Sequence, residues 1–451
     1  MKPKIPGKLW ATATGATRNL LRKRFFRSVL ILGGGTGLGQ AITILAAPIL
    51  TRLYTPSDFG LLAVYSSSLF VLVVLASFRY ELAIPLPLSD DDAAALLLLS
   101  LGLVLLTTAT VGLSALLFGH TILAAAGLPH AVGHLWLLPV GLFGAGIYQA
   151  LSYWAIRKGS FREMATTRVT QSTAQVISQV LSGIFAFGSF GLLIGDAIGR
   201  AIGSGTLFRL ANNKKIFLFR RDLFQNIPTV ARRYSRFPLI SSWSGMINTL
   251  GLHAPALLFA TFYDVQFAGW FALGQRVVAA PTTLIGRAVA QVYLKEAAPL
   301  ADTDRGRLGR LHSDLSLTLL TLSVLPFAII ASTAPWFFSI AFGKEWAEAG
   351  QLVAVITPAY LAQLVTAPLS QTLNVLERQD LQLAWDIGRF LLVLIAFSFA
   401  RALSLSGLGA SAILSGALTL SYAALFLLTR LQFSPTSAGG PRPPVHPPTP
   451  L

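Results

Sequence analysis

Three arginines within long apolar segments are the residues best suited to bind a ligand. Arg79, Arg276 and Arg287 each interrupt a stretch that is otherwise almost free of charge. An arginine inside a membrane span is costly unless it faces protein or water, so its presence favours a functional role. A guanidinium group forms two parallel hydrogen bonds with a phosphate, and we therefore expect a cationic cavity that binds a phosphorylated substrate. For Arg79 and Arg287, the alternative is that the side chains extend to the membrane surface.

Two charge pairs form a second group of candidates. Asp196 and Arg200 are four residues apart. Asp386 and Arg389 are three apart, and both spacings place the partners on one helix face. Each pair either neutralises itself inside a helical bundle or holds a substrate-binding arginine beside its carboxylate. The two aspartates are also candidates for proton or sodium coupling. A third coupling candidate is Glu81, which follows the first buried arginine by two residues and needs a partner elsewhere.

The sequence contains no pattern typical of a metal, cofactor or catalytic site. The chain has no Cys. The DxD motif at residues 90–92 precedes an apolar segment, where helix capping and compensation of the helix dipole explain it. His130 and His134 have helical spacing but no third ligand nearby in sequence. We expect no cofactor, no metal and no enzymatic activity, because no long hydrophilic loop is available to carry a catalytic acid or base.

The composition assigns these residues to a helical membrane protein. Of 451 residues, 54% are hydrophobic and only 12% are charged, and the mean hydropathy is +0.65. A soluble chain carries about 25% charged residues. We predict an all-α polytopic membrane protein with twelve transmembrane helices, near residues 28–50, 60–88, 93–118, 135–156, 168–187, 190–208, 237–261, 267–294, 315–341, 349–374, 382–402 and 407–430.

The distribution of basic residues predicts the orientation of these spans. A net charge of +17 would suggest nucleic-acid binding in a soluble protein. Here the lysines and arginines instead cluster in alternate connections, at 157–168, 209–236, 295–310 and 378, and only the short acidic second connection breaks the pattern. By the positive-inside rule, both termini and the basic loops are cytoplasmic, and we expect no nucleic-acid partner.

An internal repeat divides the chain into two halves. The segment YTPSDFGLLA at residues 54–63 aligns with YDVQFAGWFA at residues 263–272, an offset of 209 residues. Each copy begins a span, which indicates two related six-helix bundles, with chance similarity of apolar segments as the alternative. We expect, in order, a basic cytoplasmic arm (1–27), an N-terminal bundle (28–210), a cytoplasmic linker (211–236), a C-terminal bundle (237–430) and a disordered Pro-rich tail (431–451).

The first span is rich in glycine, with the segment GGGTGLG. This segment does not match a nucleotide-binding loop. Two pairs of glycines four residues apart, Gly33/Gly37 and Gly35/Gly39, allow a second helix to pack closely. Together with Pro48, they also allow the span to bend.

Four segments are distinctive: RLYTPSDFGLLAVY at 52–65 with RYELAIPLP at 79–87, YQALSYWAIRKGSFREMATTRVTQS at 148–172, FGKEWAEAG at 342–350, and APLSQTLNVLERQDLQLAWDIGRF at 367–390. The chain resembles the bacterial polysaccharide or O-antigen flippases (Wzx-type), within the superfamily of the multidrug and toxic-compound extruders and the lipid II flippases. The resemblance implies two six-helix bundles that work by alternating access. It also implies a cationic cavity for the pyrophosphate and sugars of a polyprenyl-linked oligosaccharide, whose lipid tail stays in the bilayer.

We therefore expect a flippase of the bacterial inner membrane. It would move polyprenyl-pyrophosphate-linked oligosaccharide from the cytoplasmic to the outer leaflet for O-antigen (lipopolysaccharide), exopolysaccharide or capsule biosynthesis. Expected partners are this substrate and membrane lipids, with a polysaccharide polymerase and glycosyltransferases as further candidates. The main alternative is a drug/cation antiporter of the same superfamily, which would require acidic cavity residues. The expected cavity residues are Arg79, Arg276 and Arg287, followed by Arg200 and Arg389.

Overall fold

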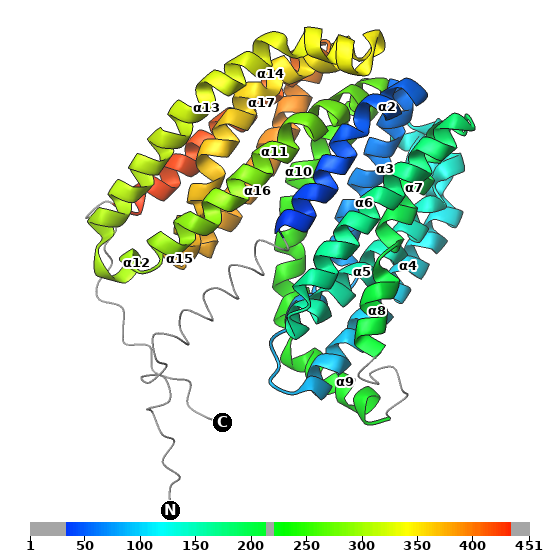
Figure 1. The fold of residues 1–451 in the computed structure, drawn as a ribbon, viewed down its shortest axis with the longest axis vertical. Helices are drawn as coiled ribbons and strands as arrows, with labels where there is room; N and C mark the ends of the chain where they lie inside the picture. Colours follow the sequence, from blue (N-terminus) through cyan, green and yellow to red (C-terminus); the bar gives the residue numbers. More distant parts are fainter. Residues whose placement is uncertain (1–32, 213–220, 434–451) are drawn as a thin grey trace, which may run out of the picture. The chain divides into compact units, whose positions relative to one another are not determined.

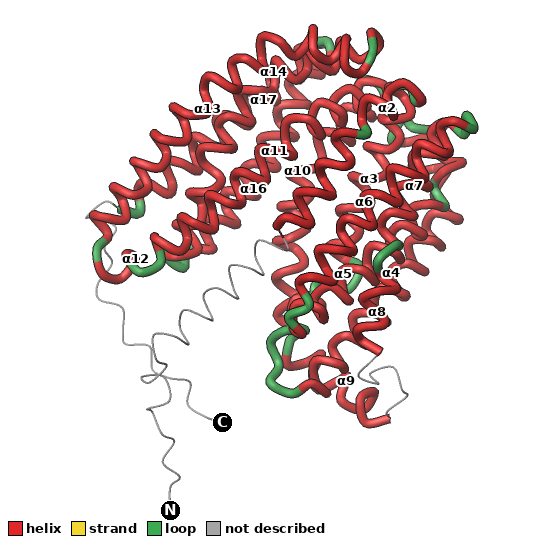
Figure 2. The backbone as a smooth tube through the Cα atoms, in the orientation of Figure 1, coloured by secondary structure: helices red, strands yellow, loops and turns green. Residues whose placement is uncertain are grey.

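The computed structural model describes residues 33–212 and 221–433, and every regular element in these ranges is helical (Figure 1, Figure 2). The predicted basic arm, most of the predicted tail and part of the predicted linker lie outside the described residues. A helical segment at 33–45 is followed by α2 (Ala47–Leu53), α3 (Pro56–Leu75), α4 (Asp90–Ala125), α5 (Leu137–Lys158), α6 (Phe161–Ile184), α7 (Gly188–Ala201), α8 (Ser204–Asn212), α9 (Arg221–Arg233), α10 (Ser242–Phe262), α11 (Val265–Ala297), α12 (Leu300–Thr303), α13 (Arg305–Phe342), α14 (Ala347–Thr366), α15 (Gln371–Val375), α16 (Gln379–Ala402) and α17 (Gly407–Leu431).

Ten helical stretches within the described ranges are long and apolar enough to cross a membrane, as expected for a multi-pass membrane protein. The predicted spans at 168–187 and 190–208 correspond to helices that are not among these ten. α6 is long enough but too polar, and α7 has only 14 residues. The count of twelve spans therefore stays a prediction.

The described residues form two compact units. The first comprises the residues up to Thr249 together with Asp264–Gly269, and the second comprises Leu250–Tyr263 and the residues from Trp270 onwards. The chain passes from the first unit to the second within α10. The bundle limits at 210 and 237 expected from the sequence stay a prediction.

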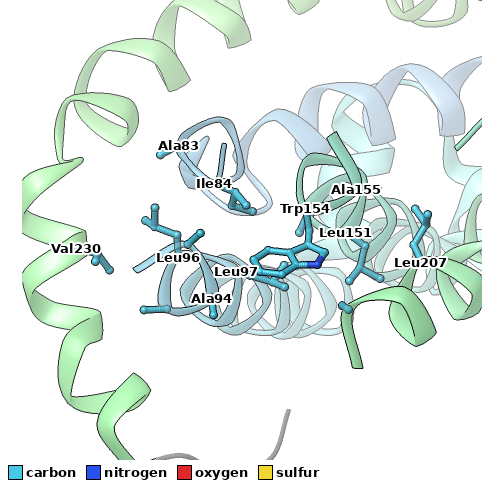
Figure 3. Close-up of a cluster of buried hydrophobic side chains, with 14 of the residues drawn as sticks. Ala83, Ile84, Ala94, Leu96, Leu97, Leu151, Trp154, Ala155, Leu207 and Val230 are labelled. Carbon is cyan, nitrogen blue, oxygen red and sulfur yellow. The ribbon is translucent and has the colours of Figure 1, made fainter. Parts of the chain in front are cut away.

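The core of the first unit surrounds the end of α5. Trp154 is 1% exposed and belongs to a buried cluster with Leu96 and Leu97 of α4 (Figure 3). α9, which covers half of the predicted linker, adds Leu223 and Val230 to this cluster. Their spacing of seven residues places both on one face of α9, which packs against α4. The predicted linker is therefore partly a folded helix of the first unit.

The acidic residues at 90–92 open α4. The hydroxyl of Ser89 accepts hydrogen bonds from the backbone N–H groups of Asp91 and Asp92 at 3.1 and 3.4 Å. The Asp90 carboxylate forms an ion pair with Lys158 at the end of α5, 2.7 Å away. These contacts confirm the interpretation of this segment as the capped start of a helix.

The predicted helix over 60–88 is wrong in its second half. α3 ends at Leu75, and Phe78 and Arg79 adopt positive φ angles of 48° and 63°. A short 3-10 helix, Tyr80–Ala83, follows. Arg79 therefore lies in a turn and not on the face of a continuous transmembrane helix.

Hydrogen bonds of a buried carboxylate accompany this break, which the continuous hydropathy conceals. Glu81 is completely buried, and the Ser77 hydroxyl donates to its carboxylate. The side-chain amide of Gln149 on α5 donates a second hydrogen bond of 2.7 Å to the same carboxylate. Pro85 and Pro87 follow and cannot continue a helical hydrogen-bond pattern. The partner that Glu81 requires is thus a pair of polar side chains.

The two copies of the repeated motif contact each other within the first unit. A methyl group added to Gly60 would collide with the backbone carbonyl of Val265, and one added to Gly269 would collide with that of Pro56. Val265 is the copy of Pro56 at the same offset of 209 residues. The two contacts are therefore one contact repeated with the partners exchanged. Such reciprocity is typical of elements related by a two-fold axis and supports the internal repeat.

In the second unit, α14 packs between α13 and α17, and α16 packs on α17. The absence of a side chain at Gly350 lets α14 approach the backbone of Ala334 and Pro335 on α13. The other side of α13 exposes large apolar side chains, including Leu322 and Leu325. Such an exposed apolar face is suited to contact with lipid.

Candidate functional site

A polar cavity of about 420 Å³ lies inside the first unit. The helical segment at 33–45 and helices α3, α5, α6 and α7 surround it. Polar and charged side chains outnumber apolar ones in its wall, which is unusual inside a membrane protein and favours a functional role. The lining residues are Thr36, Gly39, Gln40, Thr43, Phe70, Val73, Ala145, Tyr148, Gln149, Arg168, Gln171, Ser172, Gln175, Asp196, Gly199 and Arg200.

One face of α6 supplies the most polar wall. Arg168, Gln171 and Gln175 recur at intervals of three and four residues, so their side chains share that face. The same polarity excludes α6 from the ten apolar stretches. The sequence prediction missed these three residues because it considered only charges within strongly apolar segments. Their spacing on a weakly apolar span was the available signal.

Glycines in the helical segment at 33–45 allow it to pack closely on α6. A methyl group at Gly35 would lie 2.6 Å from Cβ of Ala165, and one at Gly39 would lie 2.8 Å from the Ser172 hydroxyl. This confirms the prediction that the pair Gly35/Gly39 permits close helix approach. An added methyl at Gly33 or Gly37 would meet no atom within 4 Å, so the prediction is wrong for that pair.

The pair Asp196 and Arg200 lines the cavity from α7. Nε of Arg200 lies 2.6 Å from a carboxylate oxygen of Asp196, and the guanidinium carbon lies 4.7 Å from the centre of the Phe70 ring. The Gln175 amide donates to the same carboxylate at 3.2 Å. The charges therefore neutralise each other and also border the cavity, and a substrate-binding role for Arg200 stays a prediction.

Arg168 supplies a positive charge without a carboxylate partner among the described residues. Its guanidinium carbon lies 5.0 Å from the centre of the Tyr148 ring. With Arg200 and Asp196, it brings the formal charge of the cavity wall to +1. Gln40 adds a buried Oε1 that accepts no hydrogen bond. The cavity thus offers an unneutralised cation, amide groups and two aromatic rings.

Arg79 does not line this cavity. Its guanidinium group occupies the space beside Gly245 of α10, where an added methyl would collide with it. Nε of Arg79 is buried and forms no hydrogen bond. A buried cation with an unused donor has capacity for one further acceptor.

In the second unit, Asp386 and Arg389 form a buried pair on α16. Nη2 of Arg389 lies 3.3 Å from the Asp386 carboxylate, and Arg389 is 4% exposed. The guanidinium carbon stacks 4.7 Å from the centre of the Trp385 ring. Gly251 of α10 leaves room for the same guanidinium group. This pair is enclosed, in contrast to the pair on α7.

The other two predicted arginines lie on α11. Arg276 is partly buried and Arg287 is exposed, and neither lines the polar cavity. The structure thus brings together two of the eight predicted site residues, Asp196 and Arg200, in one cavity. Within the part of the chain that the structure describes, no group of three or more His, Asp or Glu is arranged to hold a metal ion.

Comparison with known proteins identifies the family. The family model for polysaccharide biosynthesis proteins matches residues 49–351, about two thirds of the chain. The chain belongs to this family. The chain is similar to the succinoglycan biosynthesis transport protein ExoT of Rhizobium meliloti (strain 1021), with 21% identity over 333 residues, or 73% of the chain. It spans 64% of the length of that curated relative.

Solved structures share its fold. The lipid II flippase MurJ in an inward closed conformation has a TM-score of 0.61 and 14% identity, covering 92% of this chain and 90% of that one. An inward-facing multidrug resistance MATE transporter of the MOP superfamily has a TM-score of 0.59 and 16% identity, covering 90% and 94%. These likenesses confirm the predicted all-α fold with two helical bundles. The family match confirms the polysaccharide-biosynthesis part of the resemblance stated from the sequence.

Proposed function

We propose that this polysaccharide biosynthesis protein is a flippase for polyprenyl-pyrophosphate-linked oligosaccharide. In this proposal it acts by alternating access in the bacterial inner membrane, with both termini in the cytoplasm, and delivers substrate for O-antigen, exopolysaccharide or capsule synthesis. It is a transporter and not an enzyme. The observation that carries the proposal is the polar cavity with a formal charge of +1 inside a helical membrane unit.

Different residues of the cavity are proposed to bind different parts of the substrate. Arg168 has no carboxylate partner among the described side chains and is suited to bind a phosphate oxygen. Gln40 and Gln171 offer amide groups to sugar hydroxyls. Arg200 is already paired and holds its position through Asp196, which is the proposed site of proton or sodium coupling.

The predicted residues that do not line the polar cavity are proposed to act within their own units. Arg79 has an unused buried donor and is a second phosphate ligand in the proposal. Arg276, Arg287 and Arg389 are the proposed cationic residues of the second unit. Glu81 and Asp386 are proposed for ion coupling, since each is a buried carboxylate held by polar neighbours.

The energetic problem of flipping is the charge of the pyrophosphate. An anion cannot cross hydrocarbon without compensation, and an arginine in a water-filled cavity lowers this cost. A membrane potential that is negative inside also favours outward movement of the anion, by about 2.3 kcal/mol per charge per 100 mV. The cavity therefore needs to bind the head group weakly enough to release it.

Replacement of Arg168 by alanine tests the proposal. A hydrogen bond to a charged group contributes about 1.5–3 kcal/mol, so we expect the apparent affinity for the lipid-linked substrate to fall about 10- to 100-fold. The assay measures translocation of a fluorescent polyprenyl-pyrophosphate oligosaccharide in proteoliposomes. Arg162→Ala is the matched control, because Arg162 is exposed on the same helix and does not line the cavity. Equal translocation by both variants would contradict the proposal.

The alternative of a drug/cation antiporter is less well supported. Its cavity would require a negatively charged wall to attract an organic cation, whereas Arg168, Arg200 and Asp196 give this wall a formal charge of +1. Transport of a lipophilic cation by the same proteoliposomes, without translocation of the lipid-linked substrate, would favour the antiporter. A polysaccharide polymerase and glycosyltransferases remain proposed partners of the flippase.

A further inference from the structure

A second cavity, of about 530 Å³, lies in the second unit between the start of α13 and the end of α17. Three of its lining residues are arginines, namely Arg305, Arg310 and Arg430. Its apolar wall is formed by Leu427, Leu431 and Phe433. The cavity is therefore cationic on one side and apolar on the other.

The cavity lies where both helices change from charged to apolar. No charged residue follows Asp314 up to the end of α13 at residue 342, and none lies between 402 and 429 on the way to Arg430. α13 has 38 residues and is about 57 Å long, whereas the hydrocarbon core is about 30 Å thick. The charged end of α13 therefore extends beyond the hydrocarbon, which places the cavity at the level of the lipid head groups.

The three arginines are not neutralised by their surroundings. None of them forms a side-chain hydrogen bond or ion pair with a described side chain. The segments outside the described ranges contain no Asp or Glu that could reach them. Asp314 also lines the cavity and lowers the formal charge of its wall to +2. The N-terminus of α13 does not contribute, because the Asp304 carboxylate already accepts from the backbone N–H of Arg307 at 2.8 Å.

Contacts beside the cavity hold α13 and α17 at a fixed spacing. Nε2 of the fully buried His312 on α13 lies 3.0 Å from the Thr429 hydroxyl on α17. The Phe433 ring packs against the same imidazole, with centroids 5.3 Å apart. Gly309 leaves room for Phe433, since an added methyl would lie 3.2 Å from the ring. The site is therefore preformed and does not depend on a flexible loop.

An exposed apolar path leads from the cavity toward the membrane interior. On α13, Leu317 lies seven residues after Arg310 on the same face and is 62% exposed. On α17, Leu420 lies seven residues before Leu427 and is 68% exposed. An amphiphile with an anionic head and an acyl chain matches this order of cations and leucines. A free phosphate would contact only the arginines and none of the exposed leucines.

We propose that this cavity binds the phosphate head group of an anionic phospholipid, whose acyl chains lie along the exposed leucines of α13 and α17. Basic pockets between membrane helices bind such head groups by electrostatic attraction. The bound lipid then bridges Arg305 and Arg310 on one helix and Arg430 on the other. Occupancy therefore stabilises the contact between α13 and α17. The proposal does not rest on the flippase function, because it uses none of the residues of the polar cavity.

The test uses the full-length protein in nanodiscs of phosphatidylcholine, with phosphatidylglycerol titrated into them. We expect phosphatidylglycerol to raise the melting temperature and to remain bound to the protein in native mass spectrometry. An arginine near the membrane surface contributes about 1 kcal/mol, which corresponds to about fivefold in affinity. The double variant Arg310→Gln/Arg430→Gln should therefore bind phosphatidylglycerol about 25-fold more weakly.

Arg307→Gln is the matched control, because Arg307 is exposed in the same turn of α13 and does not line the cavity. It should retain the affinity of the unmodified protein. The lipid proposal is overturned if the control loses as much affinity as the double variant, or if the double variant loses none. It is also overturned if inorganic phosphate alone gives the full stabilisation. An unchanged melting temperature in pure phosphatidylcholine verifies that the variants fold.

Discussion

Replacement of Gly60 by alanine tests the close contact between the two copies of the repeat. The added methyl group would collide with the carbonyl oxygen and carbonyl carbon of Val265. These are backbone atoms, which cannot rotate away as a side chain can, so the starts of α3 and α11 must separate. Overpacking of this kind costs about 1–3 kcal/mol. We expect Gly60→Ala to lower the free energy of unfolding by this amount, and Gly269→Ala to do the same.

The assay is thermal unfolding of the purified protein, with a glycine in open surroundings as the control. A methyl group at Gly102 of α4 would meet no atom within 4 Å. Glycine in a helix interior is less favourable than alanine by about 0.5–1 kcal/mol. Gly102→Ala should therefore raise the melting temperature, whereas Gly60→Ala should lower it.

The double variant Gly60→Ala/Gly269→Ala provides the decisive measurement. A single separation of the two helix starts relieves both collisions, so the double variant should cost less than the sum of the single variants. A melting temperature of Gly60→Ala that rises as in the Gly102 control would refute the steric argument. Strict additivity would refute the claim that the two contacts are one reciprocal contact.

Three further changes test the first unit. Gly245→Ala displaces only the mobile end of the Arg79 side chain, so we expect an unchanged melting temperature but reduced translocation in proteoliposomes; unchanged translocation would exclude a role for Arg79. Asp196→Asn removes the partner of Arg200 and raises the formal charge of the cavity wall from +1 to +2. Removing one partner of a fully buried ion pair costs about 3–5 kcal/mol. The Arg200 side chain is 21% exposed, so the loss of stability should be smaller than this. A larger loss in thermal unfolding would contradict this account. Trp154→Ala should cost about 3–5 kcal/mol in the same assay, since the side chain is 1% exposed; a loss below 1 kcal/mol, about the level of a surface change, would contradict its place in the core.

The sequence predicts those features that depend on composition and local spacing. Apolar content and the alternation of basic loops indicate a polytopic helical protein. The spacing of Asp196 and Arg200 predicts a shared helix face, and the ion pair of 2.6 Å confirms it. The acidic residues at 90–92 predict a helix start, and the structure confirms it, with Ser89 as the capping residue. Each of these interactions joins residues within one turn of helix.

Features that depend on residues far apart in sequence were not predictable. The chain leaves the helical path after Leu75 and buries Glu81 against Gln149 of α5, and nothing in the local hydropathy marks that contact. The polar cavity depends on Arg168 and on Gln40, which come from helices 128 residues apart in the chain. Arg168 and Gln40 lie close together because Gly35 and Gly39 pack on α6. The sequence shows the two glycines but not which helix they pack against.

The polarity of α6 has a consequence for how the protein is made. A segment with Arg168 and three glutamines does not partition into lipid by itself, and α7, with 14 residues, is about 21 Å long and too short to span alone. The two helices pack tightly against each other. We expect the translocon to release them together as one hairpin, which a glycosylation-reporter assay on α6 with and without α7 can measure. Biogenesis would then set an upper limit on how many polar groups the cavity can acquire before its own walls fail to insert.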